Sequence, residues 1–200
     1  MRGRVFLILL LAVAGWNVLG WYMPITRPPG VLIGREPEQV LLSGPVTTFE
    51  KQGWTLKPLA TYAIEARVLH TAGYYDWNAA SALVPYDVAV GWGPMSDSAV
   101  LDRLTITQSM RWYHWQSWGG LPISHRDVET HSANMHLIAD NDEVRHAIAW
   151  LRTGALVSLK GYLVEATHPG EAKPWRSSLR RDDTGDGACE VMLVRTIRVF

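Results

Sequence analysis

The chain lacks most of the features that identify a particular chemistry. Its 200 residues include one cysteine, Cys189, which excludes a disulfide framework within the chain. Lysine and arginine balance aspartate and glutamate at 19 each, so the basic excess of a nucleic-acid-binding protein is missing. The sequence has no nucleophile elbow, phosphate-binding loop, dinucleotide fingerprint or H-E-x-x-H motif. It therefore names no reaction, although catalytic groups can also be scattered along a chain.

Hydrophobic residues, by contrast, make up 48% of the chain, which argues against disorder. The longest hydrophobic run extends from Val5 to Met23 and follows two positive charges, Arg2 and Arg4. A helix needs about 20 such residues to cross the hydrocarbon core of a membrane. We therefore interpret residues 1–23 as a single transmembrane anchor in the inner (cytoplasmic) membrane. The positive N-terminal flank predicts that the rest of the chain is extracytoplasmic, in the periplasm.

A cleaved signal peptide is the alternative interpretation of this segment. Val18, Leu19 and Gly20 form a passable cleavage site, but no A-x-A sequence follows a short hydrophobic region. A lipoprotein is excluded because no cysteine stands here. In both remaining interpretations the functional part of the protein is extracytoplasmic.

Residues 24–45 follow the hydrophobic run and are rich in proline and glycine. Because proline fixes φ and disfavours helix, we interpret this segment as a semi-extended linker that holds the domain off the membrane. Residues 46–200 then form one extracytoplasmic globular domain. This domain keeps eight of the ten tryptophans of the chain.

Strand signals dominate the globular part. Within residues 62–68, Tyr62, Ile64, Ala66 and Val68 alternate with Ala63, Glu65 and Arg67. This is the period-two pattern of a half-buried strand. Runs rich in β-branched and aromatic residues predict further strands at 86–92, 104–115, 133–138, 155–167, 175–179 and 188–199.

Two short helices are also predicted. The first covers residues 98–104, with Ser96 or Asp97 as its N-cap. The second extends to residue 152 from an N-cap at Asp140 or Asn141 and has one apolar face. The expected fold class is α+β, mainly antiparallel β, and the C-terminal end resembles part of an OB-like barrel.

The histidines raise the question of a metal site. The densest group is His125, His131 and His136, with His114 upstream. Their spacing differs from the i, i+4 pair that binds zinc on a helix, and an odd separation puts His131 and His136 on opposite faces of a strand. We therefore expect no metal site and no cofactor. Asn134 and His136 share a face, which suits a polar pocket or, the interpretation we favour, a buried hydrogen-bonded pair.

Residues 182–187 resemble the start of a calcium-binding loop. Leu193 stands where the bidentate glutamate of such a loop belongs, which removes its strongest ligand. We interpret the stretch as a polar turn between two strands.

Cys189 is the one candidate thiol nucleophile, and it would need a nearby base such as a histidine. Because it alternates with Val191 and Leu193, we interpret it as an inert residue on an apolar strand face. The alternative function is an extracytoplasmic hydrolase, whose candidate catalytic residues are His136, Cys189, Asp97 and Glu190.

Aromatic residues mark the candidate binding surfaces. The densest stretch, residues 111–118 (RWYHWQSW), either fills a β core or stacks on sugars, bases or a partner protein. Trp118 precedes two glycines, and Trp77 lies in a predicted loop at 73–78. We therefore expect Trp77 and Trp118 to be exposed and to bind the partner.

Three segments resemble those of an uncharacterised group of bacterial membrane-anchored envelope proteins: Trp92–Asp97, Asn134–Ile138 and Ser178–Glu190. The resemblance covers about residues 55–199, the extent of one domain. No activity is known for that group, so the resemblance implies a location but no catalytic residues. We predict a membrane-anchored binding module whose partner is an envelope protein or a cell-wall component.

Overall fold

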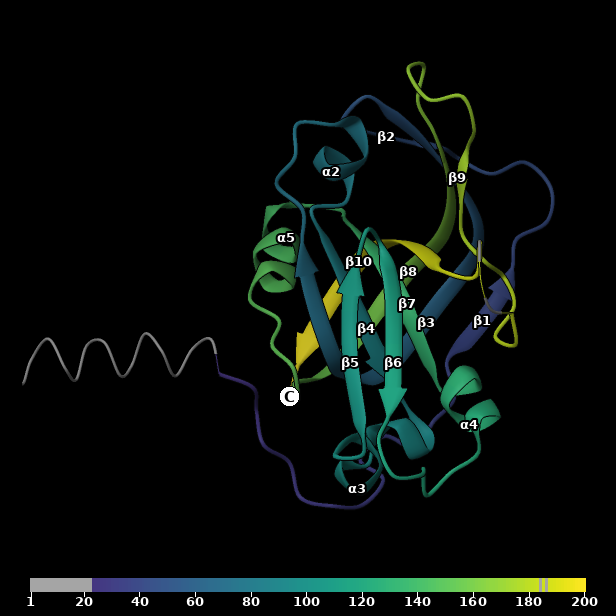
Figure 1. The fold of residues 1–200 in the computed structure, drawn as a ribbon. Coiled ribbons are helices and arrows are strands. Elements are labelled where there is room, and N and C mark those ends of the chain that lie inside the picture. The colour runs from purple at the N-terminus through teal and green to yellow at the C-terminus, as the bar shows by residue number, and fades with distance from the viewer. Residues whose placement is uncertain (1–22, 184, 186) are drawn as a thin grey trace, which may run out of the picture.

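The computed structural model describes residues 23–183, 185 and 187–200. They form an α+β fold of mostly antiparallel strands with four short α-helices (Figure 1). The strands are β1 (Glu38–Leu41), β2 (Phe49–Lys51), β3 (Trp54–Gly73), β4 (Tyr86–Gly91), β5 (Leu104–Ser109), β6 (Trp112–Ser117), β7 (Ser132–Ala139), β8 (Leu156–Thr167), β9 (Trp175–Arg176) and β10 (Glu190–Val199). The helices are α2 (Ala79–Leu83), α3 (Ser98–Leu101), α4 (His125–Thr130) and α5 (Asp142–Ala149), with a 3-10 turn, η1, at Gly93–Ser96.

The predicted anchor lies, apart from Met23, outside the described residues. Within the described part of the chain, no helix has the length and apolar character needed to cross a membrane.

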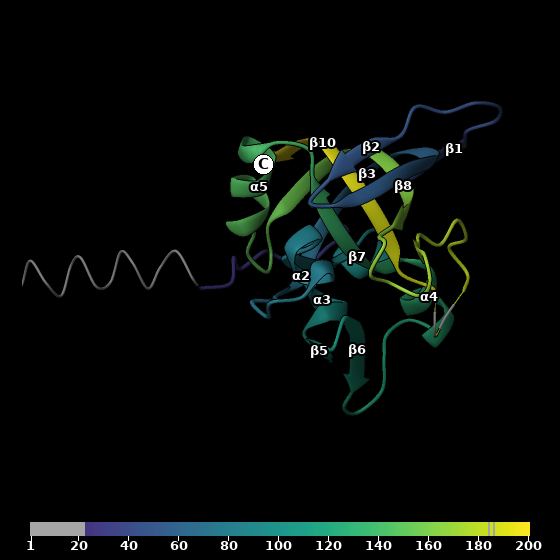
Figure 2. The same cartoon turned by 90° about the horizontal axis from the view of Figure 1, so that it is seen from above.

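Five strands form a closed cycle of pairings. β3 pairs with β4, β4 with β7, β7 with β10, β10 with β8, and β8 pairs with β3 again. The pairing of β7 with β10 is parallel and the other four are antiparallel. β1 and β2 pair with β3, and β9 pairs with β8. Figure 2 shows α5, the β5–β6 pair, and β1 with β2 on different sides of this ring.

β3 takes part in two of these pairings because it bends. Its register shifts just before Ala60 and again just before His70. Irregularities of this kind bend a strand and increase its twist. Residues 55–67 therefore pair with β8, whereas residues 67–73 pair with β4. The strand predicted at 62–68 lies in the middle of β3 and is confirmed.

The interior of the ring holds the main hydrophobic core. Alternate residues of the strands point inward, among them Ile64, Leu159 and Met192, and all three are buried. Val144 and Ile148 from α5 pack against the same core. The apolar residues from which this helix is predicted are therefore the residues that pack against the core.

Most of the predicted elements are present. β4, β7, β8 and β10 match the predicted strands, while the strand expected at 175–179 is limited to two residues. Asn141 caps α5, because its side chain accepts a hydrogen bond from the backbone N–H of Val144 at 2.9 Å. Asp97 caps α3. α2 and α4 are additional to the two helices that the sequence predicts.

The single strand predicted at 104–115 is wrong, because this run folds into a hairpin. β5 ends and β6 begins on either side of Met110 and Arg111. Both residues have positive φ, 48° and 65°, as the two central residues of a type I′ hairpin turn require. Such turns usually contain Asn and Gly, so a Met-Arg turn carries no recognisable sequence signal.

Residues 24–45 join the globular part at several points. The backbone N–H of Ile25 donates to the carbonyl oxygen of Thr153 at 2.8 Å, and Ile33 is buried in the main core. β1 pairs with β3 along four residues. The segment interpreted as a linker therefore adds a strand and a core residue to the domain.

Candidate functional site

A polar pair lies on the outer face of β4 and β7, on the side away from the main core. Asp87 and His136 are direct partners in the antiparallel register, so their side chains emerge side by side. His136 Nδ1 lies 2.7 Å from Asp87 Oδ1. Asp87 is fully buried and His136 is 3% exposed. Burial of a carboxylate is costly without compensating groups, so the pair depends on its other neighbours.

Arg111 brings the opposite charge from the tip of the β5–β6 hairpin. Its Nη1 lies 3.2 Å from Asp87 Oδ1. The guanidinium also donates to the carbonyl oxygen of Val84 and to the hydroxyl of Ser81. Its central carbon lies 4.1 Å from the centre of the Tyr74 ring. Arg111 therefore holds the β5–β6 hairpin against the outer face of the ring.

Tyr74 and Trp175 pack over this cluster. The ring of Trp175 is centred 4.8 Å from that of His136 and 5.2 Å from the guanidinium carbon of Arg111. Burial, together with the charge of Asp87, raises the pKa of Tyr74 to about 12, so its hydroxyl stays protonated at neutral pH. The same hydroxyl accepts a 2.9 Å hydrogen bond from the backbone N–H of Arg111. The cluster is a packed network that positions the hairpin.

Asn134 extends the network along the same face, two residues before His136. Its Nδ2 donates to the carbonyl oxygen of Arg111 at 2.9 Å and lies 3.5 Å from Cys189 Sγ. Gln108 of β5 donates to Asn134 Oδ1 at 2.5 Å. Asn134 and His136 are both buried and hydrogen-bonded as expected, but among the described residues they bond to other side chains and backbone groups and not to each other, so the predicted pair is not formed.

A pocket of about 230 Å³ adjoins Asn134, between β6, α4 and the chain before β10. Its aromatic lining consists of Trp112, Tyr113 and Trp115. Its polar lining includes Glu129, Ser132, Asn134, Asp183 and Cys189. Trp112 is 40% exposed, so part of its ring is accessible to solvent. Aromatic and hydrogen-bonding groups together suit a ligand that has both an apolar face and polar substituents.

Cys189 is half-buried in the lining of this pocket. Burial raises the pKa of its thiol to about 11; the hydrogen bond from Asn134 lowers it, and the carboxylates of Glu190, Asp87 and Asp183 raise it. The thiol therefore stays protonated at neutral pH. Among the described residues, no hydrogen bond joins Cys189 to His136, so the pair that thiol catalysis needs is not formed.

Asp97 lies apart from this face. Its Oδ1 accepts hydrogen bonds from the backbone N–H of Ala99 at 2.8 Å and of Gly30 at 2.7 Å. The bond from Ala99 caps α3, and the bond from Gly30 holds the segment before β1 against the end of η1. The structure gives Asp97 a local role at a helix end.

Glu190 lies on the inner side of β10, two residues before the core residue Met192. It is 6% exposed, and within the described chain its Oε2 has no hydrogen-bond partner. Burial is the main reason that the pKa of Glu190 is raised to about 8; a backbone hydrogen bond and the charge of Arg181 lower this pKa, and the charge of Asp183 raises it. Of the four hydrolase candidates, the structure brings His136 and Cys189 to one face and places the two carboxylates elsewhere.

Trp77 and Trp118 are both exposed. Trp77 precedes α2 and is fully exposed, and Trp118 follows β6 and is 73% exposed. Figure 1 shows α2 near one end of the β5–β6 hairpin and the end of β6 near the other. Neither residue belongs to the lining of the pocket beside Asn134.

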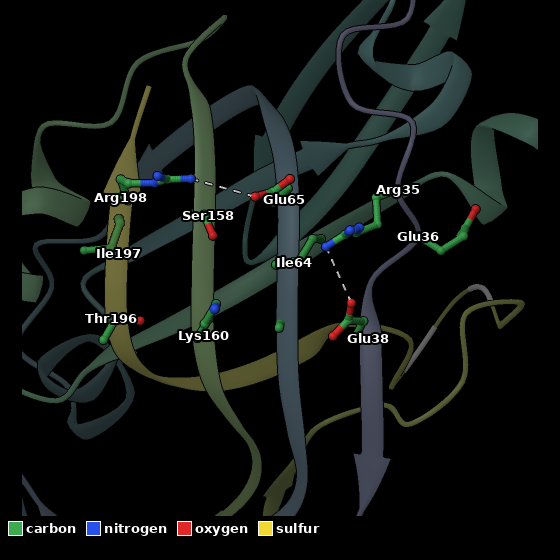
Figure 3. A pocket seen from close by; sticks show the side chains of 11 residues that line it. Arg35, Glu36, Glu38, Ile64, Glu65, Ser158, Lys160, Thr196, Ile197 and Arg198 are labelled. Carbon is green, nitrogen blue, oxygen red and sulfur yellow. Dashed lines mark ion pairs between the residues drawn. The ribbon is translucent and has the colours of Figure 1, made fainter.

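A larger hollow, of about 440 Å³, lies over β3, β8 and β10 (Figure 3). Figure 3 shows Arg198 reaching past Ser158 toward Glu65, and Arg35 pointing toward Glu38. The nitrogen–oxygen distances of these two ion pairs are 3.9 and 3.8 Å. Ion pairs in contact with solvent contribute about 0–1 kcal/mol each. Opposite charges alternate over this hollow, so it offers no uniform charge to a ligand of one sign.

Asp87 and Gln108 are among the site residues that the sequence does not single out, and Arg111 is noted there only as part of the aromatic stretch 111–118. Asp87 could have been found, because it is a charged residue within an apolar strand. A charged residue is rarely buried at such a position without a partner, so its presence indicates a partner nearby. Arg111 is hidden because its turn contains neither glycine nor asparagine.

Within the described residues, no group of three or more His, Cys, Asp or Glu side chains is placed to hold a metal ion. Comparisons of the chain with protein-family models, curated proteins and solved structures find no match.

Proposed function

We propose that this protein is a membrane-anchored binding module of the bacterial envelope, with its globular domain in the periplasm. The hydrophobic run from Val5 to Met23 and its positive flank support the anchor and its orientation. Binding is favoured over hydrolysis, because the thiol of Cys189 stays protonated and lacks a bond to histidine among the described residues. The observation that carries the proposal is the aromatic and polar pocket beside β6.

We read the ring of strands as an OB-like barrel. Its strands in chain order are β3, β4, β7, β8 and β10, and α5 lies between the third and the fourth. The third pairs in parallel with the fifth, and the fourth pairs with the first. Barrels of this type bind oligosaccharides and oligonucleotides on the face of strands two and three, with help from the loops between strands one and two and between four and five. The pocket adjoins β7, the third strand, and its lining includes Asp183, Gly185, Ala188 and Cys189 of the last of these loops.

The lining of the pocket favours a cell-wall carbohydrate. A sugar ring has an apolar face that stacks on an aromatic ring such as that of Trp112. Its hydroxyl groups can bond to the amide of Asn134 and to the carboxylates of Glu129 and Asp183. The same carboxylates repel the phosphates of a nucleic acid, and the chain has no basic excess to offset them.

The substitution Trp112→Ala tests this assignment. Loss of a tryptophan at the centre of a binding site costs about 2 kcal/mol, or about thirtyfold in affinity. We expect the full-length chain in detergent to sediment with purified peptidoglycan, and the variant to require about thirtyfold more protein for equal binding. Met110→Ala is the matched control, because Met110 is 84% exposed on the same hairpin but outside the pocket. Equal sedimentation of folded wild-type and Trp112→Ala protein would refute the pocket as the site.

Trp77 and Trp118 are the proposed contacts outside the pocket. Trp77 lies in the loop between the first two strands of the ring, and Trp118 follows β6. The same sedimentation assay assigns them: weaker binding of a Trp77→Ala, Trp118→Ala variant with unchanged thermal unfolding supports this placement. Unchanged binding rejects it and leaves the pocket as the contact.

A further inference from the structure

The chain joins the domain immediately after the hydrophobic run. The backbone N–H of Ile25 donates to Thr153, and Arg27 Nε donates to the carbonyl oxygen of Gly154 at 3.0 Å. Glycine at position 154 permits this approach, because a Cβ there would collide with the carbonyl oxygen of Ile25. Figure 1 shows the chain after residue 23 passing close to the C-terminus before it continues to α3.

The remaining length of chain is too short to separate the domain from a membrane. Pro24 alone stands between Met23, where the hydrophobic run ends, and Ile25. Two residue steps span at most about 7 Å. The headgroup layer on each side of a bilayer is about 5–8 Å thick. With the run across the membrane, the surface to which Ile25 is bonded lies at the lipid headgroups.

Three residues with exposed aromatic side chains lie near this attachment point, and together with Pro24 we call them the anchor-side face. Tyr75 is 80%, Trp150 58% and Phe200 46% exposed. Tyr75 and Trp150 line, with Pro24, a hollow of about 240 Å³. The carbonyl oxygen of Phe200 accepts a 3.3 Å hydrogen bond from Arg27. Tyrosine and tryptophan are enriched at membrane–water interfaces because their rings are amphipathic.

The charges near this face include several arginines. Arg27 belongs to the attached segment, and Arg152 lines the hollow beside Pro24. Arg198, which also pairs with Glu65, has its guanidinium carbon 5.2 Å from the centre of the Phe200 ring. Asp102 lines a second hollow beside Pro24 and contributes a negative charge. Arginine binds phosphate through its planar fork, so this composition suits a layer of lipid phosphates.

We propose that the anchor-side face rests in the headgroup layer of the membrane and holds the domain in a fixed orientation. The inference rests on the proposed anchor, because a chain cut after residue 23 would have no reason to stay at the bilayer. The anchor-side face binds the lipid surface, with its aromatic rings at the membrane–water interface and the arginines toward the lipid phosphates.

The test uses the full-length chain in vesicles of phosphatidylethanolamine and phosphatidylglycerol that contain a headgroup-labelled nitroxide lipid. An Ala149→Cys variant carries a fluorophore beside Trp150, and Ala172→Cys is the matched control. Both alanines are exposed, but Ala172 lies in the β8–β9 loop, away from α5 (Figure 1). Wild-type protein measures the background from half-buried Cys189. Because the headgroup layer is only about 5–8 Å thick, we expect at least about twofold stronger quenching at position 149.

A second variant separates docking from attachment. About 12 glycine and serine residues inserted between Met23 and Pro24 add a tether of about 19 Å and should lower the quenching at position 149 to that at position 172. Equal quenching at the two positions without the insertion would overturn docking, while flotation with the vesicles would still support the anchor. Failure of the chain to float with the vesicles would overturn the anchor, and docking with it.

Discussion

We expect Glu190 to link the stability of the domain to pH. Its side chain is buried on the inner side of β10, close enough for its charge to act on Tyr62, and within the described chain neither Glu190 Oε2 nor the Tyr62 hydroxyl has a hydrogen-bond partner. Burial raises the pKa of Glu190 from 4.5 to about 8. Between these two values the folded protein holds a proton that the unfolded chain releases. The free energy of unfolding must therefore fall as the pH rises through this window.

The size of this effect follows from the shift. Each unit between the folded and unfolded pKa corresponds to about 1.4 kcal/mol, so the whole difference corresponds to about 5 kcal/mol. Between pH 5 and pH 8 the loss is on the order of 3–4 kcal/mol. In a domain of this size about 1 kcal/mol moves the melting temperature by 2–4 °C, so the expected decrease is about 10 °C.

The assay is thermal unfolding of the full-length chain in detergent, followed by near-ultraviolet circular dichroism at several pH values. Glu190→Gln keeps the shape of the side chain but does not titrate, so its melting temperature should lack most of this decrease. Glu143→Gln, an exposed carboxylate on α5, is the control and should behave as wild type. The change of melting temperature with pH is compared, and not the melting temperature itself, because the buried amide of the variant has its own desolvation cost at every pH. Equal changes of melting temperature with pH in wild type and Glu190→Gln would show that Glu190 does not cause the pH dependence.

Two further predictions concern the outer face of β4, β7 and β10. Arg111→Ala leaves the buried carboxylate of Asp87 without its counter-charge and should reduce stability by about 3 kcal/mol, with partial recovery when Asp87→Asn is added. An unchanged melting temperature in Arg111→Ala would contradict this role. Cys189, with its pKa raised to about 11, should react with iodoacetamide on the order of a hundredfold more slowly at neutral pH than an exposed thiol. A rate equal to that of free cysteine would contradict the burial and the raised pKa of the Cys189 thiol.

Local patterns predict the elements that depend on local physics. The period-two alternation around Tyr62–Val68 identifies the middle of β3, because one face of that strand packs into the core. The apolar spacing after Asn141 identifies α5, and the cap explains where the helix begins. The hairpin of β5 and β6 is missed because Met110 and Arg111 adopt positive φ without a residue type that favours it.

The hydrophobic run, the balance of charge, most of the strands and the exposure of Trp77 and Trp118 follow from local sequence. The pairing of the strands does not, because register depends on partners far apart in the chain. The tertiary structure also decides that Arg111 meets Asp87 and that Glu190 faces the core. Alternation along a strand separates its two faces but does not tell which face meets the interior. That choice is made by the closure of the whole ring, which buries one face and leaves the other to the hairpin and the pocket.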